Sequence, residues 1–253
     1  MVKGLNLFHE HFTAYADRYV LIGGTACTLV MEEAGLPFRA TKDLDIVLCI
    51  EALDGEFVQA FWQFVSLGRY QHRQRSTGER QYYRFSHPED DTYPSVIELF
   101  SRRSDALEGL SGQHLIPIPL EDEGYYLSAI LLEDECYEFI LAGKEEVDGL
   151  PVVAPDHLIP LKAFAWLDLR DKRDSGVQIQ DGHIRKHLRD IFRLYQLLTP
   201  ETSLPLTGSM RAMFLRFLAE SEIGMVDLSD IMIHPTSIEQ IVGNLRRIYG
   251  CVE

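Results

Sequence analysis

A pair of glycines between two short apolar runs constrains the fold of this chain more than any other feature. The run "YVLI" (19–22) ends at Gly23 and Gly24, a stretch with helical spacing covers 25–35, and the β-branched run "LDIVLCI" covers 44–50. Short β-branched runs are typical of buried strands. The pattern therefore predicts a strand, a glycine turn, a helix and a second strand that returns beside the first.

Two aspartates, Asp43 and Asp45, stand two positions apart at the start of the second run. Residues at this spacing in a strand point to the same face, so their carboxylates repel each other unless they are solvated or neutralised. One interpretation is a solvated strand end. The other uses Gly23 and Gly24, because a glycine turn that opens a helix lets backbone N–H groups approach a phosphate, to which the hydroxyl of Thr25 can add a contact.

A divalent cation would join a phosphate loop to a pair of carboxylates. Mg²⁺, or Mn²⁺ in its place, binds carboxylate and phosphate oxygens together, and such sites usually draw a third acid from a neighbouring strand. Glu98, a lone acid in the apolar run "SVIELF", is the candidate. The alternative is that Glu98 faces solvent from an edge strand.

The string "GGTA…RATKDLDIVL" resembles the nucleotidyltransferase superfamily that includes DNA polymerase beta. It is most similar to the AbiEii-type toxin nucleotidyltransferases of bacterial type IV toxin–antitoxin systems. In that group Arg-x-Thr precedes the aspartates, which implies roles for Arg39 and Thr41 in binding the NTP. The resemblance also implies a lysine on a later helix, here Lys162, and an acid on the next basic helix, here Asp190.

The resemblance implies a role for each of these residues. Asp43 and Asp45 would hold the metal, and Glu98 would ligate it and take the proton of the attacking hydroxyl. The loop 23–25 would hold the β- and γ-phosphates, and Lys162 would neutralise triphosphate charge from across a domain boundary. Two departures are the glutamate in place of the more common third aspartate, and 103–153, which matches nothing in the family.

Lys162 and Asp190 also have simpler interpretations. Lys162 is the lone Lys or Arg between Lys144 and Arg170, and it could be a helix lysine whose stem lies along apolar neighbours. Asp190 could be the surface partner of Lys186, one helical turn earlier.

Near 150–155 the sequence changes from short strand-like runs to segments with helical periodicity, and this predicts an α+β fold. A mixed-sheet nucleotidyltransferase core at 1–153 would be followed by a helical C-terminal domain at 154–253, with the active site between them. We expect strands at 80–87 and 95–102, short strands over 114–120, 127–133 and 137–155, helices at 154–170, 183–198, 209–222 and 237–250, and a polar linker at 170–182.

Composition limits the partners and the compartment. A net charge of −15 argues against a protein that coats nucleic acid. There is no apolar run long enough to span a membrane, and residues 1–12 lack the apolar stretch that is typical of a signal peptide, so we expect none. Four cysteines without CxxC spacing are typical of reduced thiols, so we expect a cytoplasmic protein.

The stretch 69–84 is basic within this acidic chain. It holds five arginines against one acid, with tyrosines between them. It could bind the backbone of an RNA acceptor, or it could be a solvated hairpin whose arginines pair with acids elsewhere. The histidines His183 and His187 share a helix face but lack a third ligand at a fixed spacing, so we interpret them as structural.

These observations predict a Mg²⁺-dependent nucleotidyltransferase that moves a nucleotidyl group from an NTP to a hydroxyl of RNA, protein or a small molecule. As the toxin of a toxin–antitoxin pair, it would have an antitoxin as partner. The alternative is a regulatory module with the same fold that binds nucleotide without turnover.

Overall fold

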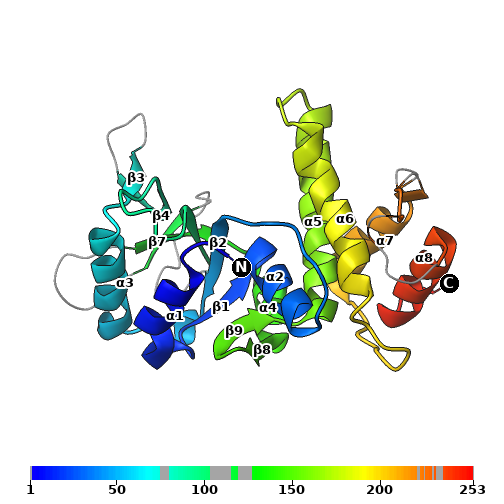
Figure 1. Cartoon of the computed structure of the whole chain (residues 1–253). Helices are drawn as coiled ribbons and strands as arrows, with labels where there is room; N and C mark the ends of the chain where they lie inside the picture. The colour runs from blue at the N-terminus through cyan, green and yellow to red at the C-terminus, as the bar shows by residue number, and fades with distance from the viewer. Residues whose placement is uncertain are drawn as a thin grey trace. The chain divides into compact units, whose positions relative to one another are not determined.

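The computed structural model describes residues 2–74, 80–102, 115–118, 127–220, 223–224, 226–229, 231 and 236–252. The chain divides into two compact units, Met1–Val153 and Ala154–Glu253. Figure 1 shows the chain with most of its helices and strands labelled.

The first unit contains the sheet. Its strands are β1 (Tyr19–Ile22), β2 (Asp43–Leu48), β3 (Gln71–Gln74), β4 (Arg80–Ser86), β5 (Val96–Ser101), β6 (Leu115–Ile118), β7 (Leu127–Leu131), β8 (Lys144–Val147) and β9 (Leu150–Val153). Its helices are α1 (Leu5–Phe12), α2 (Gly23–Glu33), α3 (Gly55–Leu67) and α4 (Asp134–Ala142), with 3₁₀ turns at Thr13–Tyr15 and Ile50–Ala52.

The strands of this unit form one mixed sheet. Seven of them lie in the order β3-β4-β5-β2-β1-β9-β8, and the β6–β7 pair joins through β7 to β5. The β1–β2 and β4–β5 pairs are antiparallel, whereas β2 pairs with β5 in parallel. The predicted mixed sheet is confirmed, and β5 is an interior strand between β2 and β4.

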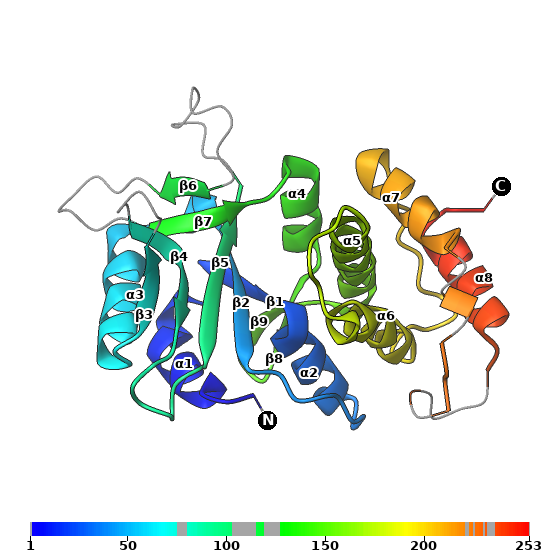
Figure 2. The ribbon, with the colours of Figure 1, turned by 90° about the horizontal axis from the view of Figure 1, so that it is seen from above.

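Aromatic side chains cover one face of the sheet. Phe8 and Phe12 of α1 pack on Tyr19 of β1, and Phe61 of α3 packs on Phe85 of β4. Figure 2 shows α1 and α3 on one side of the sheet and α2 on the other. Burying such rings is the largest apolar contribution in a unit of this kind.

The opposite face carries the polar positions. Leu44, Ile46, Ile97 and Leu99 are buried, and Asp43, Asp45 and Glu98, which alternate with them along β2 and β5, are exposed or half-buried. Because side chains alternate between faces along a strand, the three acids share the face away from the aromatic cluster.

The second unit is helical in the part that the structure describes. Its α-helices are α5 (Pro155–Asp174), α6 (Asp181–Tyr195), α7 (Gly208–Leu218) and α8 (Ile238–Ile248). The sheet unit together with this helical unit confirms the α+β class. Within the described residues, no helix has both the length and the apolar character needed to cross a membrane.

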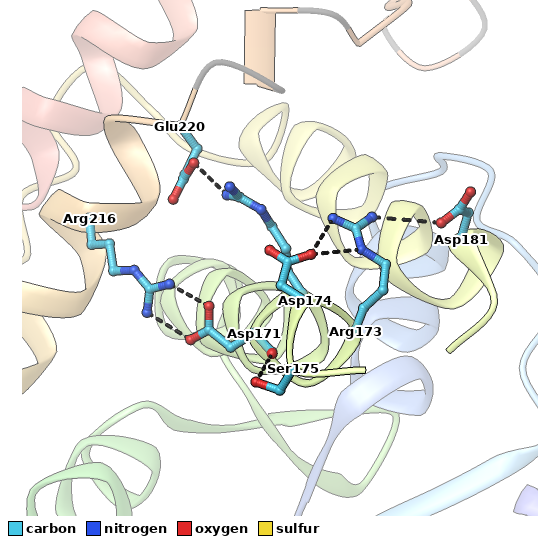
Figure 3. Close-up of polar contacts among 8 residues, drawn as sticks. Asp171, Arg173, Asp174, Ser175, Asp181, Arg216 and Glu220 are labelled. Atoms are coloured by element: carbon cyan, nitrogen blue, oxygen red, sulfur yellow. Dashed lines mark hydrogen bonds and ion pairs between the residues drawn. The ribbon is translucent and has the colours of Figure 1, made fainter. Parts of the chain in front are cut away.

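Charged side chains tie the end of α5 to neighbouring helices of its own unit (Figure 3). Arg216 of α7 donates to Asp171 through both terminal nitrogens, and Arg170 pairs with Glu220. The side chains of Asp171 and Arg216 are about half exposed, so this pair adds little stability by itself.

The structure corrects three sequence-based boundaries. The segment "YEFILA", expected as a strand, lies in helix α4, because Tyr137 and Ile140 are buried at helical spacing and two acids occupy the first turn. Helix α2 begins at Gly23, so the two glycines form its first turn and do not precede it. Helix α5 continues to Asp174, which shortens the expected linker.

Candidate functional site

At Gly23, the turn from β1 into α2 lies against the side chain of Asp45. In the β1–β2 pair, Ile22 lies opposite Asp45, so Asp45 stands beside the point where β1 turns into α2. Gly23 has φ +69°, and a Cβ added to it would lie 1.9 Å from Oδ2 of Asp45. The Asp45 carboxylate therefore occupies the space that any other side chain at position 23 would need.

Gly24 lies against the segment that precedes β2 in the same way as Gly23 lies against Asp45. A Cβ at Gly24 would lie 2.6 Å from Oγ1 of Thr41 and 3.7 Å from Nη2 of Arg39. The Arg39 guanidinium also lies over the ring of Phe38, 5.4 Å from its centroid. The structure thus brings the Gly-Gly pair, the Arg-x-Thr residues and Asp45 together at one turn.

Thr25 ties the start of α2 to the start of β2. Its side chain is fully buried, and Oγ1 donates a hydrogen bond of 2.8 Å to the carbonyl oxygen of Asp43. The hydroxyl is engaged in this bond, so Thr25 positions the turn in this structure. The N-cap of α2, Ile22, makes no side-chain cap, and the positive end of the helix dipole lies at this turn.

Glu98 lies beside Asp45 on the next strand. The parallel β2–β5 register pairs Asp45 with Glu98 and Asp43 with Val96. Residues paired across neighbouring strands point to the same face, so Glu98 and Asp45 are adjacent on the polar face. Because β5 is an interior strand, the alternative that placed Glu98 on an edge strand is wrong.

Arg84 of β4 completes this row of the sheet. It lies opposite Glu98 in the antiparallel β4–β5 register, and its Nη1 donates to Oε1 of Glu98. The Glu98 side chain is 21% exposed and that of Arg84 is 41% exposed. One row across the sheet therefore reads Ile22, Asp45, Glu98 and Arg84.

The donor set is suitable for a hard divalent cation, but the acids are not gathered around one point. Carboxylate oxygens are the ligands that Mg²⁺ and Mn²⁺ prefer. In the described part of the chain, no group of three or more His, Cys, Asp or Glu residues lies close enough to hold a metal ion. The third acid, Glu98, is paired with Arg84 in this structure.

Lys162 and Asp190 meet inside the helical unit. Lys162 of α5 is 4% exposed and Asp190 of α6 is fully buried, and Nζ lies 3.4 Å from Oδ2. Nη1 of Arg193 lies 3.5 Å from the other oxygen, Oδ1. Asp190 is therefore buried and is not part of a surface pair, and the implied role of Lys162 at a triphosphate stays a prediction.

Two described arginines of the basic stretch 69–84 are paired with acids. Arg69 pairs with Glu89 at 2.9 Å, and Arg84 pairs with Glu98. These pairings match the hairpin alternative at both positions. Arg75 and the side chains of Arg73 and Arg80 lie outside what the structure describes, so RNA binding by the stretch stays a prediction.

Sequence reasoning missed one residue of the site. The sequence pattern places Arg84 among the arginines of the stretch 69–84 and does not indicate that it pairs with Glu98. The signal was the alternation of polar Arg84, apolar Phe85 and polar Ser86, which places Arg84 on a polar face. The register that sets it opposite Glu98 comes from the sheet.

Comparisons with known proteins give distant structural likenesses. No known family and no curated protein matches the sequence. A solved structure of an antigenic nucleotidyltransferase-like protein from Paracoccidioides brasiliensis is 14% identical, with a TM-score of 0.44 over 94% of this chain and 96% of that one. The Megavirus polyadenylate synthase is 9% identical, with a TM-score of 0.38 over 88% of this chain and 37% of that one. Both TM-scores are below 0.5, so the argument for function rests on the residues themselves.

Proposed function

We propose that this chain is a nucleotidyltransferase that moves a nucleotidyl group from an NTP to a hydroxyl acceptor and releases pyrophosphate. One observation carries the proposal. The Asp45 carboxylate lies against Gly23 at the start of α2, while Glu98 lies beside Asp45 on the same face of the sheet. A helix start for phosphate and adjacent carboxylates for a cation are what this reaction requires.

Different residues at this turn would bind the phosphates and accept the proton. The first backbone N–H groups of α2, at the positive end of the helix dipole, would bind the anionic phosphates. Arg39 and Thr41, which lie over Gly24, would bind the same phosphates from the side. Glu98 would accept the proton of the attacking hydroxyl.

Asp43, Asp45 and Glu98 would hold Mg²⁺, or Mn²⁺ in its place. When bound, the cation would neutralise charge on the triphosphate and on the departing pyrophosphate. The oxygen donors, and the position of the Asp45 carboxylate against Gly23 at the start of α2, support this assignment.

The finer parts of the proposal rest on the resemblance of "GGTA…RATKDLDIVL" to AbiEii-type toxins. They are a role as the toxin of a type IV pair, an antitoxin as partner, and RNA or protein as acceptor. Four cysteines, none in a disulfide, support a place in the cytoplasm.

A second candidate function is nucleotide binding without turnover. The observation that favours it is the ion pair of Glu98 with Arg84, since it occupies the third acid. Under this alternative an NTP would raise the melting temperature of the protein, but no label would be transferred.

The test is a labelling experiment. The purified chain is incubated with total RNA, Mg²⁺ or Mn²⁺, and each of the four NTPs labelled at the α-phosphate, and label on RNA and on the protein is measured. Wild type should transfer label from at least one NTP. Asp45→Asn should lose at least about a thousandfold, since metal catalysis supplies several kcal/mol and 1.36 kcal/mol is a factor of ten.

The matched control is Asp91→Asn. Asp91 is a fully exposed acid that pairs with Lys3, so its loss should leave transfer unchanged. Equal activity in Asp45→Asn and wild type would exclude Asp45 as a ligand. An NTP-dependent rise in melting temperature without any transfer would favour the second candidate.

A further inference from the structure

The ion pair between Arg84 and Glu98 sits at the side of the proposed site that a cation would use. Glu98 lies between Asp45 on one neighbouring strand and Arg84 on the other, and all three are in register. Glu98 is therefore shared between two possible partners, a cation held with Asp45 and the guanidinium of Arg84.

The Arg84–Glu98 pair is less exposed to solvent than the Arg69–Glu89 pair. The side chains of Glu98 and Arg84 are 21% and 41% exposed, whereas those of Arg69 and Glu89 are 73% and 65% exposed. Charges that are partly removed from water are screened less, so the Arg84–Glu98 attraction exceeds that of the exposed pair.

Two positive charges cannot share Glu98 without cost. A divalent cation ligated by Asp45 and Glu98 would lie close to the guanidinium, and like charges at such distances repel. A cation at Glu98 therefore requires that Arg84 give up some or all of its contact.

We propose that Arg84 is a positioning residue, which holds Glu98 in the metal-free protein and is exchanged for the divalent cation when the cation binds. The inference rests on the proposed function, because it assumes that Asp45 and Glu98 ligate a metal. It adds a consequence that the reaction alone does not require, namely that Arg84 lowers the affinity of the site for the cation.

The experiment measures Mn²⁺ binding without any turnover. Free Mn²⁺ is followed by its electron paramagnetic resonance signal as protein is titrated in the absence of nucleotide. Arg84→Met removes the charge and keeps an apolar stem. This variant should bind Mn²⁺ on the order of tenfold more tightly, because the repulsion between a unit charge and a divalent ion about 6 Å apart in water corresponds to about that factor.

Two further variants make the result specific. Arg69→Met removes an exposed arginine that pairs with Glu89, and it should bind Mn²⁺ as wild type does. In the double variant Arg84→Met/Glu98→Gln the gain in affinity should disappear. If Arg84→Met does not fold, Arg84→Gln replaces it, since glutamine is also uncharged and can still form hydrogen bonds.

Melting in EDTA gives a second readout. Without a metal, Arg84→Met leaves the Glu98 charge next to Asp45, so its melting temperature should fall below that of wild type and of Arg69→Met. Saturating Mn²⁺ should then raise the melting temperature of Arg84→Met more than that of wild type.

The outcomes separate the two proposals. If wild type binds Mn²⁺, Asp45→Asn does not, and Arg84→Met binds as wild type or more weakly, the exchange is overturned and the metal site stands. If neither wild type nor Arg84→Met binds Mn²⁺, the metal site of the proposed function fails, and the exchange fails with it.

Discussion

Gly23 is the residue at which the backbone and the proposed site depend on each other. Its φ of +69° turns β1 into α2, and its missing side chain leaves room for the Asp45 carboxylate. Any L-residue at this position would be strained, and it would also displace Asp45.

Gly35 allows these two effects to be separated. It has nearly the same φ, +71°, but nothing lies within 4 Å of a Cβ added to it. Gly35→Ala should therefore cost about 1–2 kcal/mol through backbone strain alone. Gly23→Ala should cost at least about 2 kcal/mol more, because a partly buried carboxylate must move.

Urea unfolding of both variants measures the difference in the free energy of unfolding. A larger loss for Gly23→Ala, together with loss of Mn²⁺ binding in that variant alone, is expected. Equal losses in the two variants would show that Asp45 moves aside freely.

At the scale of elements, the contact between α5 and α6 contains a buried cluster of charge. Asp190 is fully buried, 3.4 Å from Nζ of Lys162 and 3.5 Å from Nη1 of Arg193, so one carboxylate faces two cations. Removing one partner of a buried pair leaves the other charge without compensation, which costs about 3–5 kcal/mol.

The cluster predicts an asymmetry between two variants. Asp190→Asn should cost about 3–5 kcal/mol, since it removes the carboxylate next to buried Lys162 and half-buried Arg193. Lys162→Met should lower the free energy of unfolding less than Asp190→Asn does, by about 1 kcal/mol or more, because Asp190 still has its contact with Arg193. Equilibrium unfolding in urea measures both losses.

The control for this pair lies on the same helix. Lys172 pairs with Asp168 on α5, and both side chains are more than half exposed, so Lys172→Met should change stability by less than about 0.5 kcal/mol. A loss for Lys162→Met as small as that for Lys172→Met would mean that the buried pair is not needed for the fold.

The start of α3 depends on a single capping aspartate. Asp54 accepts from the backbone N–H of Phe57 at 2.9 Å and from Arg18 at 2.6 Å. The hydrogen bond from Phe57, and then the contact with Arg18, lower the pKa of Asp54. The charged form of Asp54 therefore stabilises the folded state.

The expected pH dependence follows from that direction. A carboxylate whose pKa is lower in the folded state stabilises the protein above its unfolded pKa of about 3.9 and loses this effect as the pH falls through the folded value. Asp54→Ala should cost about 1 kcal/mol at pH 7. Asp54→Asn, which keeps a capping oxygen, should cost less, and its gap to wild type should close below about pH 4.

Thermal unfolding of wild type and Asp54→Asn between pH 3 and pH 7 tests whether the difference in stability depends on the charge of Asp54. A gap between Asp54→Asn and wild type that stays constant across this range would mean that the charge of Asp54 contributes nothing to stability.

At the scale of the whole molecule, local patterns predicted most elements, but they could not predict which elements pair. The strand 19–22 is found as expected, because "YVLI" ends at a glycine turn that can be recognised in the sequence. The prediction of a strand at "YEFILA" was wrong, because a short apolar run has no period long enough to distinguish a strand from a helix.

Pairing across the sheet and between helices depends on tertiary packing. The register of Glu98 between Asp45 and Arg84 joins three strands, and no local pattern encodes such a choice. Likewise, the sequence showed that Lys162 lies in an apolar helix, but the buried contact with Asp190 requires the packing of α5 on α6.

The parallel pairing of β2 with β5 also affects the order in which the chain folds. Helix α3 and strands β3 and β4 lie between these two strands in sequence, whereas α2 and the segment that follows it separate β1 from β2. Closing the longer loop costs more entropy, so the contact of Gly23 with Asp45 can form while Glu98 is still remote. A cation that needs both acids then binds only after the slower step. In stopped-flow experiments Mn²⁺ should slow unfolding and leave the refolding rate nearly unchanged.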